Sequence, residues 1–404
     1  MNPTPLLRKD IQDYINKQLQ ADCSKLALQK NPFPEVPWLD IIQQIQSKQK
    51  CFGKLPTWYQ TTNLIYPVKL SIEQSSSELT AQYKSTLING NTLLDLTGGM
   101  GVDAYYFAKR FNHVTHCELS AALSASVQHN FSEFGLEQVD FVVGDSLNYL
   151  QQTNRQYDCI YVDPSRRNEA KGKVFLLEDC LPNVPEHLSE LFAYTSTILV
   201  KTAPILDLSS GLKSLQNVQQ IHIVAVDNEV KELLWLLQKD SDCLPTIHCV
   251  NLTKNDSTPV VFEWNSAETC AFSLPKNYLF EPNSAIMKSG KFAAVANKFG
   301  LSKLHEHSHL YTHDSILPFP GRIFTIEICL PYSKQTMQKL GLTKANISTR
   351  NFPDSVEEIR KKWKIKDGGS SYCFFTTDLN NQKIVLLCSK QNLTPWKSST
   401  AFYS

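Results

Sequence analysis

The stretch Leu94-Asp95-Leu96-Thr97-Gly98-Gly99-Met100-Gly101-Val102-Asp103 decides the fold of this chain. An apolar strand runs into a glycine-rich turn, and a helical pattern follows. Glycine suits such a turn because a Cβ atom would block close approach of the backbone to a ligand. The start of the following helix offers unpaired N–H groups to an anionic group. We therefore predict that this turn binds a cofactor.

Outward from the turn, strand and helix patterns alternate from residue 86 to about residue 270. This alternation predicts an α/β fold, namely a Rossmann-like, doubly wound and mostly parallel sheet of about seven strands. The candidate strands are Thr92–Leu96, Val114–Cys117, Val139–Val143, Cys159–Val162, Thr197–Val200, Ile221–Val226, Thr246–Asn251 and Val260–Trp264.

The sequence pattern of residues 1–85 predicts a mainly helical N-terminal region. Apolar residues have helical spacing over Leu6–Leu19 and Trp38–Ile45. A short strand is predicted at Val68–Ile72, before a helix that starts at Ser75.

Residues 271–404 do not continue the alternation and predict a small α+β domain. Ser355 and Glu358 are spaced as a capping box for a helix. Tyr372–Thr376 and Lys383–Leu387 are predicted to form a hairpin.

Composition narrows the possible classes of protein. Hydrophobic residues make up 42% of the 404 residues, enough to bury a sizeable core. The 40 basic and 39 acidic side chains give a net charge of +1, so a surface for an anionic partner must be a local patch. The 11 cysteines form no CxxC pair, unlike a zinc site or a disulfide framework. We find no apolar run of ~18 residues and no signal-peptide core, so we expect a cytoplasmic protein without a membrane partner.

Polar residues follow the strands around the glycine turn. Asp95 precedes the glycines, Glu118 ends the second strand, and Asp145-Ser146 follows the third. Open α/β sheets bind ligands at the carboxyl ends of their strands, so we expect these residues to share one site. Gly99-x-Gly101 with Glu118 also fits a nicotinamide fingerprint, which keeps an oxidoreductase as an alternative.

The fourth strand ends in Asp163-Pro164-Ser165-Arg166-Arg167, which a dehydrogenase does not require. A carboxylate or carbonyl that accepts an N–H can orient an attacking amine toward an electrophilic methyl group. We predict Asp163, Pro164, Ser165 and Arg166 as catalytic residues. Arg166 and Arg167 are suited to hold the phosphate beside a target nucleotide.

Roughly residues 65–265 resemble class I S-adenosylmethionine-dependent methyltransferases. The resemblance rests on an ordered set of strand-end residues, namely Asp95 to Gly101, Glu118, Asp145 and Asp163–Arg166. The resemblance implies S-adenosylmethionine as the cofactor. It implies that Glu118 binds the ribose, and that Asp145 and Ser146 bind the adenine. Thr97 stands where the family commonly has glycine. The segment 70–78 resembles the preceding cofactor motif and implies a contact from Gln74. The residues implied around the methionine part are Asp95, Thr97, Gly98, Gly99 and Gly101.

The whole chain resembles a bacterial group of methyltransferases with a THUMP-like domain. Tyr278–Asn283 and Thr349–Pro353 carry this closer resemblance, which implies an RNA partner, tRNA or rRNA. Asp163–Arg166 resembles the Asp-Pro-Pro-Tyr and Asp-Pro-Pro-Arg motifs of nucleic-acid methyltransferases. No cysteine follows Val200 at the end of the next strand, so we predict nitrogen methylation rather than covalent C5 methylation. A methyltransferase for a small molecule or a protein is the other alternative.

A basic segment, Arg360 to Lys366, surrounds Trp363 and suits a phosphate backbone, although a solvated helix end is also possible. The predicted RNA-binding residues are Arg167, Arg350, Arg360, Lys361, Lys362, Lys364 and Lys366.

The pattern His305-x-His307-x-His309 predicts a surface strand with three histidines on one face. We expect no metal there, because ligand sets usually come from more than one element.

Overall fold

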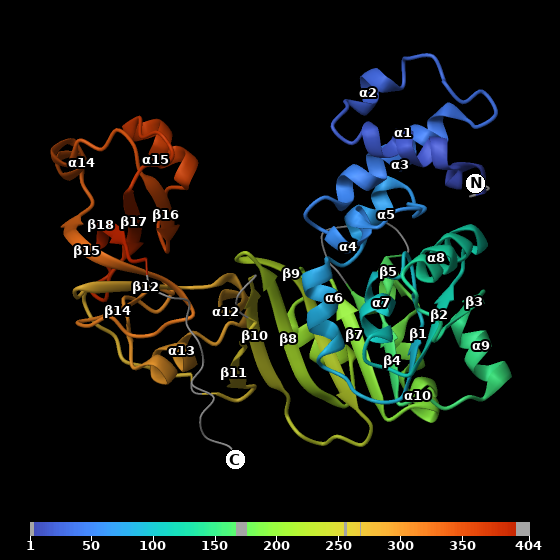
Figure 1. The fold of residues 1–404 in the computed structure, drawn as a ribbon. Helices are drawn as coiled ribbons and strands as arrows, with labels where there is room; N and C mark the ends of the chain where they lie inside the picture. The colour runs from blue at the N-terminus through green and yellow to red at the C-terminus, as the bar shows by residue number, and fades with distance from the viewer. Residues whose placement is uncertain (1–3, 167–175, 254–256, 267, 393–404) are drawn as a thin grey trace. The chain divides into compact units, whose positions relative to one another are not determined.

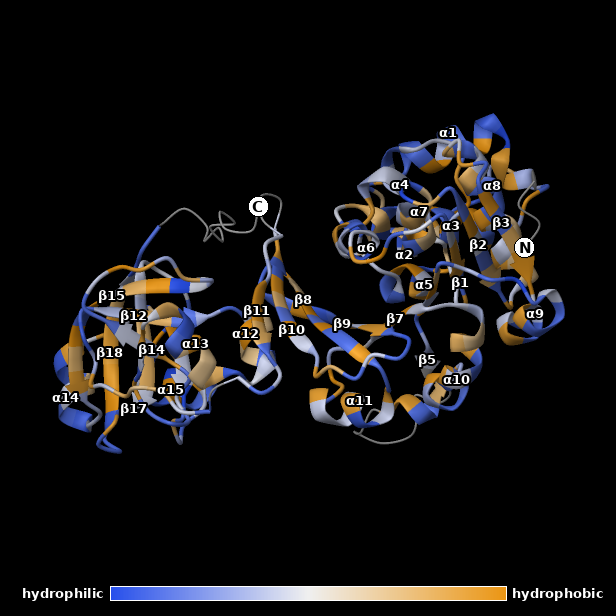
Figure 2. Cartoon of the chain, turned by 90° about the horizontal axis from the view of Figure 1, so that it is seen from below, coloured by the Kyte–Doolittle hydropathy of each residue, from blue (hydrophilic) through white to orange (hydrophobic). Residues whose placement is uncertain are grey.

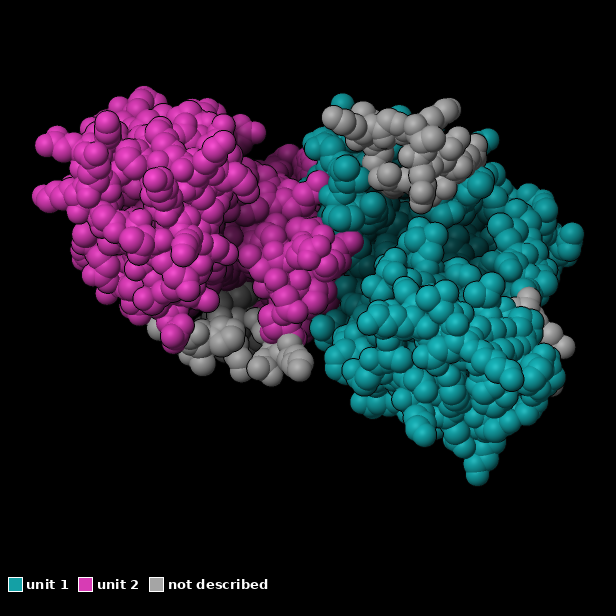
Figure 3. Space-filling view, turned by 90° about the horizontal axis from the view of Figure 1, so that it is seen from above, with its two compact units in different colours: residues 1–221, 232–243 teal, residues 222–231, 244–404 magenta. Residues whose placement is uncertain are grey.

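The computed structural model describes residues 4–166, 176–253, 257–266 and 268–392. Figure 1 shows its helices and strands. The chain forms two compact units: unit 1 comprises residues 1–221 and 232–243, and unit 2 comprises residues 222–231 and 244–404. Figure 3 shows the two units in teal and magenta.

The larger sheet has the strand order β11-β10-β8-β9-β7-β4-β1-β2-β3. Strands β1, β2, β3, β4 and β7 run parallel, and β9 pairs antiparallel with β7. The predicted doubly wound, parallel-rich sheet is therefore confirmed, but it has nine strands rather than about seven. Its strands are β1 Thr92–Asp95, β2 His113–Glu118, β3 Val139–Val143, β4 Cys159–Val162, β7 Thr197–Thr202, β8 Val218–Val226, β9 Glu229–Gln238, β10 Thr246–Leu252 and β11 Val260–Glu263.

The sequence analysis missed β9. Its residues from Glu232 to Leu237 are all buried, so the strand lacks the alternation that marks a half-buried strand. A continuous apolar run cannot be distinguished from a buried helix by its period.

Helices flank the strands of unit 1 (Figure 1). They are α6 Glu78–Ser85, α7 Val102–Ala108, α8 Ala121–Glu133, α9 Ser146–Thr153, α10 Val184–Tyr194 and α11 Leu208–Ser214. A short ribbon after β4 pairs β5 (Ser165–Arg166) with β6 (Cys180–Leu181), with the turn η2 (Leu177–Asp179) before β6. Strand order reverses between β1 and β4, and such a switch point is where open sheets bind ligands.

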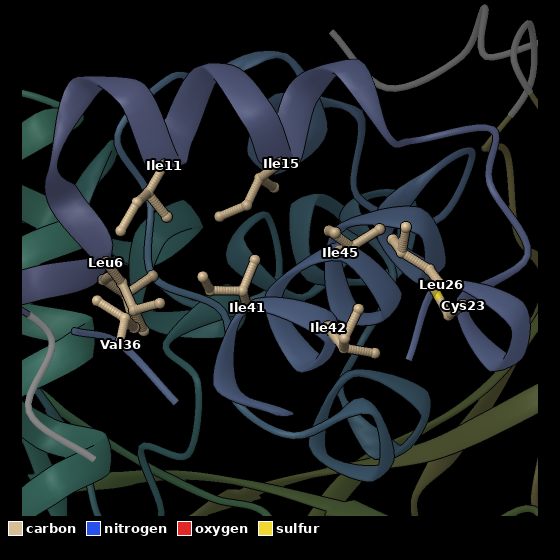
Figure 4. Close-up of a cluster of buried hydrophobic side chains, with 10 residues drawn as sticks. Leu6, Ile11, Ile15, Cys23, Leu26, Val36, Ile41, Ile42 and Ile45 are labelled. Carbon is tan, nitrogen blue, oxygen red and sulfur yellow. The ribbon is translucent and has the colours of Figure 1, made fainter. Parts of the chain in front are cut away.

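The N-terminal region is helical, as predicted, and has its own apolar cluster from Leu6 to Ile65, shown in part in Figure 4. The predicted strand at Val68–Ile72 is wrong, because Lys69–Gln74 form a helix, α5. Only Ile72 of this helix is buried, and it packs beside α3 rather than at a sheet edge. The other elements are η1 Thr4–Leu7, α1 Lys9–Lys17, α2 Cys23–Leu26, α3 Trp38–Cys51 and α4 Pro56–Gln60.

Unit 2 contains a second sheet, of order β13-β14-β12-β15-β18-β17-β16, which confirms the α+β prediction. The predicted hairpin and the Ser355–Glu358 capping box are both present. Apolar residues run along β17 and β18 (Figure 2). The elements are β12 Tyr278–Pro282, α12 Ser284–Ser289, α13 Phe292–Phe299, β13 Ser302–Lys303, β14 Tyr311–His313, β15 Gly321–Pro331, α14 Lys334–Leu340, β16 Asn346–Arg350, α15 Val356–Trp363, β17 Ser371–Thr377 and β18 Lys383–Lys390.

The three histidines of residues 305–309 do not lie on a strand, so that prediction is wrong. Strands β13 and β14 pair with each other, and the histidines form the connection between them. His309 has a left-handed backbone (φ 53°) and stacks on Phe292 at 3.5 Å between ring centroids. His305 bonds to Asn351 and Asn381. Within the described ranges we find no metal-binding group of three His, Cys, Asp or Glu residues. No helix in those ranges is long and apolar enough to cross a membrane.

Candidate active site

The glycines of the turn after β1 serve different purposes. At Gly98 a Cβ atom would lie 2.2 Å from Nε2 of the buried His116, so side-chain packing requires glycine there. Gly101 has a φ of 76° and is the N-cap residue of α7. Gly99 has a φ of 55°, but a Cβ there would meet no atom nearer than 3.8 Å. Gly99 is thus the position of the turn with open space beside it.

Thr97 ties the glycine turn to the end of β4. Its hydroxyl oxygen accepts the N–H of Asp163 at 2.7 Å, and its own N–H donates to Oδ1 of Asp95 at 3.0 Å. Glycine could not make the first of these bonds. The departure from the common family pattern therefore has a structural reason.

Asp95 is buried below the turn. Burial raises the pKa of Asp95 well above its ordinary value, and the carboxylates of Asp103, Asp163 and Glu118 raise it further, against the N–H of Thr97. Acidic groups from the ends of β1, β2 and β4 and from α7 therefore gather around Asp95. Lysines pair with Asp103 and Asp163, so Glu118 is the carboxylate of this group best placed to stabilise a bound cation.

The end of β2 combines an acidic side chain with an apolar one. Glu118 accepts the N–H of Gly99 at 3.1 Å through Oε2 and the N–H of Ser120 at 2.8 Å through Oε1. Leu119 and Val143 are 73% and 55% exposed, and Val143 pairs with Glu118 in register. Apolar side chains exposed at two neighbouring strand ends suit a planar ring. The sequence analysis missed them, although an apolar residue directly after Glu118 was a readable signal.

Asp145 is exposed after β3 and serves as the N-cap of α9. Its Oδ1 accepts the N–H of Asn148 at 2.8 Å. Ser146 is the first residue of the helix. The predicted adenine-contacting pair therefore lies at the same strand edge as Glu118, because β2 and β3 are parallel neighbours.

Asp163 pairs with Lys201, at the end of the neighbouring strand β7. Nζ of Lys201 lies 2.5 Å from Oδ2 of Asp163. Burial alone would lower the pKa of Lys201, but the carboxylates of Asp163, Glu232 and Asp103 outweigh burial and raise it. Lys201 is thus a paired, largely buried cation.

A buried ionic network fixes the first turn of α7. The side chain of Lys84 is wholly buried, with Nζ 2.8 Å from Glu232 and 3.2 Å from Asp103. Nζ also donates to Oγ of Ser76 at 2.9 Å. Oδ2 of Asp103 accepts hydrogen bonds from Ser76 at 2.8 Å and Tyr161 at 2.9 Å. These contacts hold α7 against α6, β4 and β9.

The segment after α5 connects the N-terminal region to α7. Ser76 enters the ionic network, and Glu78 accepts hydrogen bonds from Thr57 and Tyr106. Gln74 is the exposed last residue of α5. Its predicted cofactor contact stays a prediction.

Pro164 is buried and Ser165 is exposed where β5 begins. Arg166 continues β5, and Arg167 lies outside the described residues. Cys159, the nearest cysteine before the motif in sequence, is buried in β4, and burial raises its pKa to about 12. This position does not suit a nucleophile.

The predicted RNA-binding residues of unit 2 divide into two groups. Arg360 donates to the carbonyls of Ala345 and Ile365 at 3.4 Å and pairs with Asp367. Lys362 pairs with Asp354 at 3.2 Å. Lys362 is exposed despite this pair, and so are the three remaining residues, Lys361, Lys364 and Lys366.

Arg350 pairs with Glu281 at 3.0 Å. The two sequence segments of the closer family resemblance therefore meet at this ion pair.

Three family models match the chain: RNA cap guanine-N2 methyltransferase at residues 90–174, a ferredoxin-like domain at 278–320 and a THUMP-like domain at 321–390. The solved structure of a candidate methyltransferase from Porphyromonas gingivalis W83 is 33% identical, with a TM-score of 0.86 over 95% of this chain and 98% of that one. Ribosomal RNA small subunit methyltransferase J of Francisella tularensis subsp. novicida (strain U112) is 31% identical over 93 residues. That match spans 20% of this chain and 39% of the relative.

Proposed function

The chain belongs to the same family as the Porphyromonas gingivalis protein, the class I methyltransferases with a THUMP-like domain, and we propose that it methylates a base nitrogen in rRNA or tRNA. The observation that carries this proposal is the placement of Asp163. Thr97 and Lys201 hold it at the end of β4, beside the glycine turn. An amine presented there would find an oriented acceptor.

The residues at the strand ends fit S-adenosylmethionine, which supplies a methyl group on a positively charged sulfur. Gly99 leaves open space, and Glu118 has lone pairs left for ribose hydroxyls. Leu119 and Val143 offer apolar surface to adenine. The carboxylate of Glu118 suits a cation. We assign Asp95, Thr97, Gly98, Gly99 and Gly101 to the methionine part, and Gln74, Asp145 and Ser146 to further contacts.

Asp163 would act by accepting a hydrogen bond from the nucleobase. Lys201 occupies Oδ2, which leaves Oδ1 and the Pro164 carbonyl to accept N–H bonds from the base. The nitrogen lone pair would then point toward the methyl group for direct, in-line transfer. The nitrogen–carbon bond forms as the sulfur–carbon bond breaks, and the methylated nitrogen would release its N–H proton to Asp163 or to solvent. We assign Ser165 to the same catalytic position, and Arg166 and Arg167 to the neighbouring phosphate.

We propose that residues 86–270 carry the methyl transfer and residues 271–404 bind the RNA, in the cytoplasm. The match to ribosomal RNA methyltransferase J and the THUMP-like domain support an RNA substrate.

Nucleoside mass spectrometry of RNA from cells with and without the gene tests the activity. One methylated base should disappear from rRNA or tRNA and return when the purified enzyme is added. Return with the wild type but not with Asp163→Ala would tie the activity to this site. RNA containing 5-fluorouracil should form no stable covalent complex, and a trapped complex would contradict direct transfer.

Calorimetry tests the cofactor separately. The wild type should bind S-adenosylmethionine, and Gly99→Arg should abolish binding while the protein remains folded. Tight binding of a nicotinamide dinucleotide, without binding of S-adenosylmethionine, would favour the oxidoreductase alternative.

A further inference from the structure

A second candidate binding site is a pocket of about 210 Å³ that lies wholly within unit 2. Its polar lining residues include Asn228, Asn251, Asn283 and Arg322. Its apolar lining residues include Val260 and Phe319. A pocket of this volume has room for a small polar group and part of what it is attached to.

The three asparagines that line the pocket each use the side-chain oxygen to accept a backbone N–H. Oδ1 of Asn228 accepts the N–H of Ser284 at 2.8 Å. Oδ1 of Asn251 accepts the N–H of Asn228 at 2.7 Å, and Oδ1 of Asn283 accepts the N–H of Ile286 at 3.0 Å. Because each oxygen already serves a backbone donor, each NH₂ group is what remains to offer a ligand. Within the described residues none of these three amide nitrogens has a hydrogen-bond acceptor.

Arg322 adds a positive charge that Glu281 fixes in place. Nε of Arg322 donates to Glu281 Oε2 at 2.7 Å, and Nη2 of Arg350 donates to Oε1 at 3.0 Å. Glu281 is 3% exposed, whereas Arg322 and Arg350 are 40% and 35% exposed. One buried carboxylate thus orients two guanidinium groups and leaves the trio with a net charge of +1. Guanidinium groups held in this way are suited to oxyanions.

We propose that this pocket binds a phosphate group of the RNA substrate, with the attached ribose against Val260 and Phe319. The polar lining residues combine three amide donors with a fixed cation, which together complement an oxyanion. Tyr278–Asn283 is one of the two segments that carry the closer family resemblance. In this proposal its Asn283 offers an amide donor to the phosphate, and its Glu281 orients Arg322. The identity of the ligand as RNA rests on the proposed function, but the phosphate chemistry does not.

Asn283→Asp and Asn228→Asp test the pocket with almost no change of shape. Aspartate keeps the oxygen that caps α12 at residue 283 and tolerates the left-handed backbone at residue 228 (φ 66°). Each change replaces a donor with a charged acceptor. Asn63→Asp is the matched control, since Asn63 is exposed, has a φ of 59°, and lies in unit 1.

Binding of a 3′-labelled single-stranded RNA to the full-length protein is measured by fluorescence anisotropy. Both pocket variants should weaken binding about tenfold, and the slope of log K against log salt should fall by ~0.7 for the lost phosphate contact. Asn63→Asp should change neither quantity. Unchanged affinity and slope in both pocket variants would overturn the RNA proposal.

Inorganic phosphate and 5′-AMP, titrated by calorimetry, distinguish the two sources of phosphate. If 5′-AMP binds the wild type but not Asn283→Asp, while RNA affinity is unchanged, the pocket serves a small phosphorylated molecule and the RNA assignment is wrong. Affinity for S-adenosylmethionine should be equal in all variants. RNA binding that depends on the pocket, in a protein without methyl transfer, would refute the proposed function and leave the pocket assignment intact.

Discussion

The ammonium group of Lys201 and the carboxylate of Asp163 lie 2.5 Å apart and join the ends of two neighbouring parallel strands, β7 and β4. The backbone of Asp163 is also fixed, because its N–H donates to Thr97. The direction of the carboxylate is therefore set before a substrate binds.

Replacing Lys201 with methionine should reduce turnover by about 10²-fold, because Asp163 would lose the contact that directs it. Affinity for S-adenosylmethionine should change little, since the proposed cofactor residues lie on other strand ends. Lys201→Arg keeps the charge and should retain part of the rate. Steady-state kinetics and calorimetry on the same preparations measure both quantities. A Lys201→Met enzyme with wild-type turnover would show that the ion pair is only structural.

Gly98→Ala should destabilise unit 1 by about 1–3 kcal/mol, because the added methyl group would overlap the buried ring of His116. Combining it with His116→Ala removes the overlap. The double variant should therefore be less destabilised than the sum of the two single variants. Urea unfolding of the four proteins measures this coupling, and simple additivity would mean that the loop moves away from His116.

His116 makes stability depend on pH. Burial lowers its pKa from 6.5 to about 4, so the unfolded chain takes up a proton at a higher pH than the folded protein. The stability from the neutral ring is complete above pH 6.5 and is lost as pH falls toward 4, by up to about 1.4 kcal/mol per pH unit. Urea unfolding at several pH values should show this loss, and His116→Gln should reduce it. Some slope should remain in that variant, because burial also lowers the pKa of His222.

The two groups of basic residues near α15 should respond differently to neutralisation. Lys361, Lys364 and Lys366 are exposed, so changing them to glutamine should weaken RNA binding and reduce its salt slope by about one unit per lost phosphate contact. Arg360→Gln should instead lower the melting temperature of unit 2, since Arg360 bonds to Ala345, Ile365 and Asp367. Salt titrations and thermal unfolding separate these effects. Equal salt slopes in the triple variant and the wild type would leave the lysines with a solvating role.

Much of unit 1 could be predicted from short stretches of sequence. Buried parallel strands are continuous apolar runs, and the turn at Gly98 and the polar residues Glu118 and Asp163 mark where such runs end. Strands β3 and β4 have the predicted bounds. The clustering of the acidic residues could then be predicted as well, because the carboxyl ends of neighbouring parallel strands lie at the same edge of the sheet.

Contacts that depend on strand order could not be predicted. Lys201 meets Asp163 only because β7 lies next to β4. The basic segment near Trp363 showed its charge in the sequence, but the acidic partner of Lys362, Asp354, is supplied by the fold. The alternating histidines of His305–His309 led to a wrong prediction of a strand. The segment is instead the turn that connects β13 to its partner β14.

A ribosome makes Lys84 long before Glu232, since 148 positions separate them. Helices α6 and α7 can form early from local contacts, but the amino group of Lys84 lacks its second carboxylate until β9 has entered the sheet beside β7. Such long-range pairing comes late in folding. We therefore expect the nascent chain to have no finished cofactor turn until translation has passed β9, so that a prematurely released fragment would not consume S-adenosylmethionine.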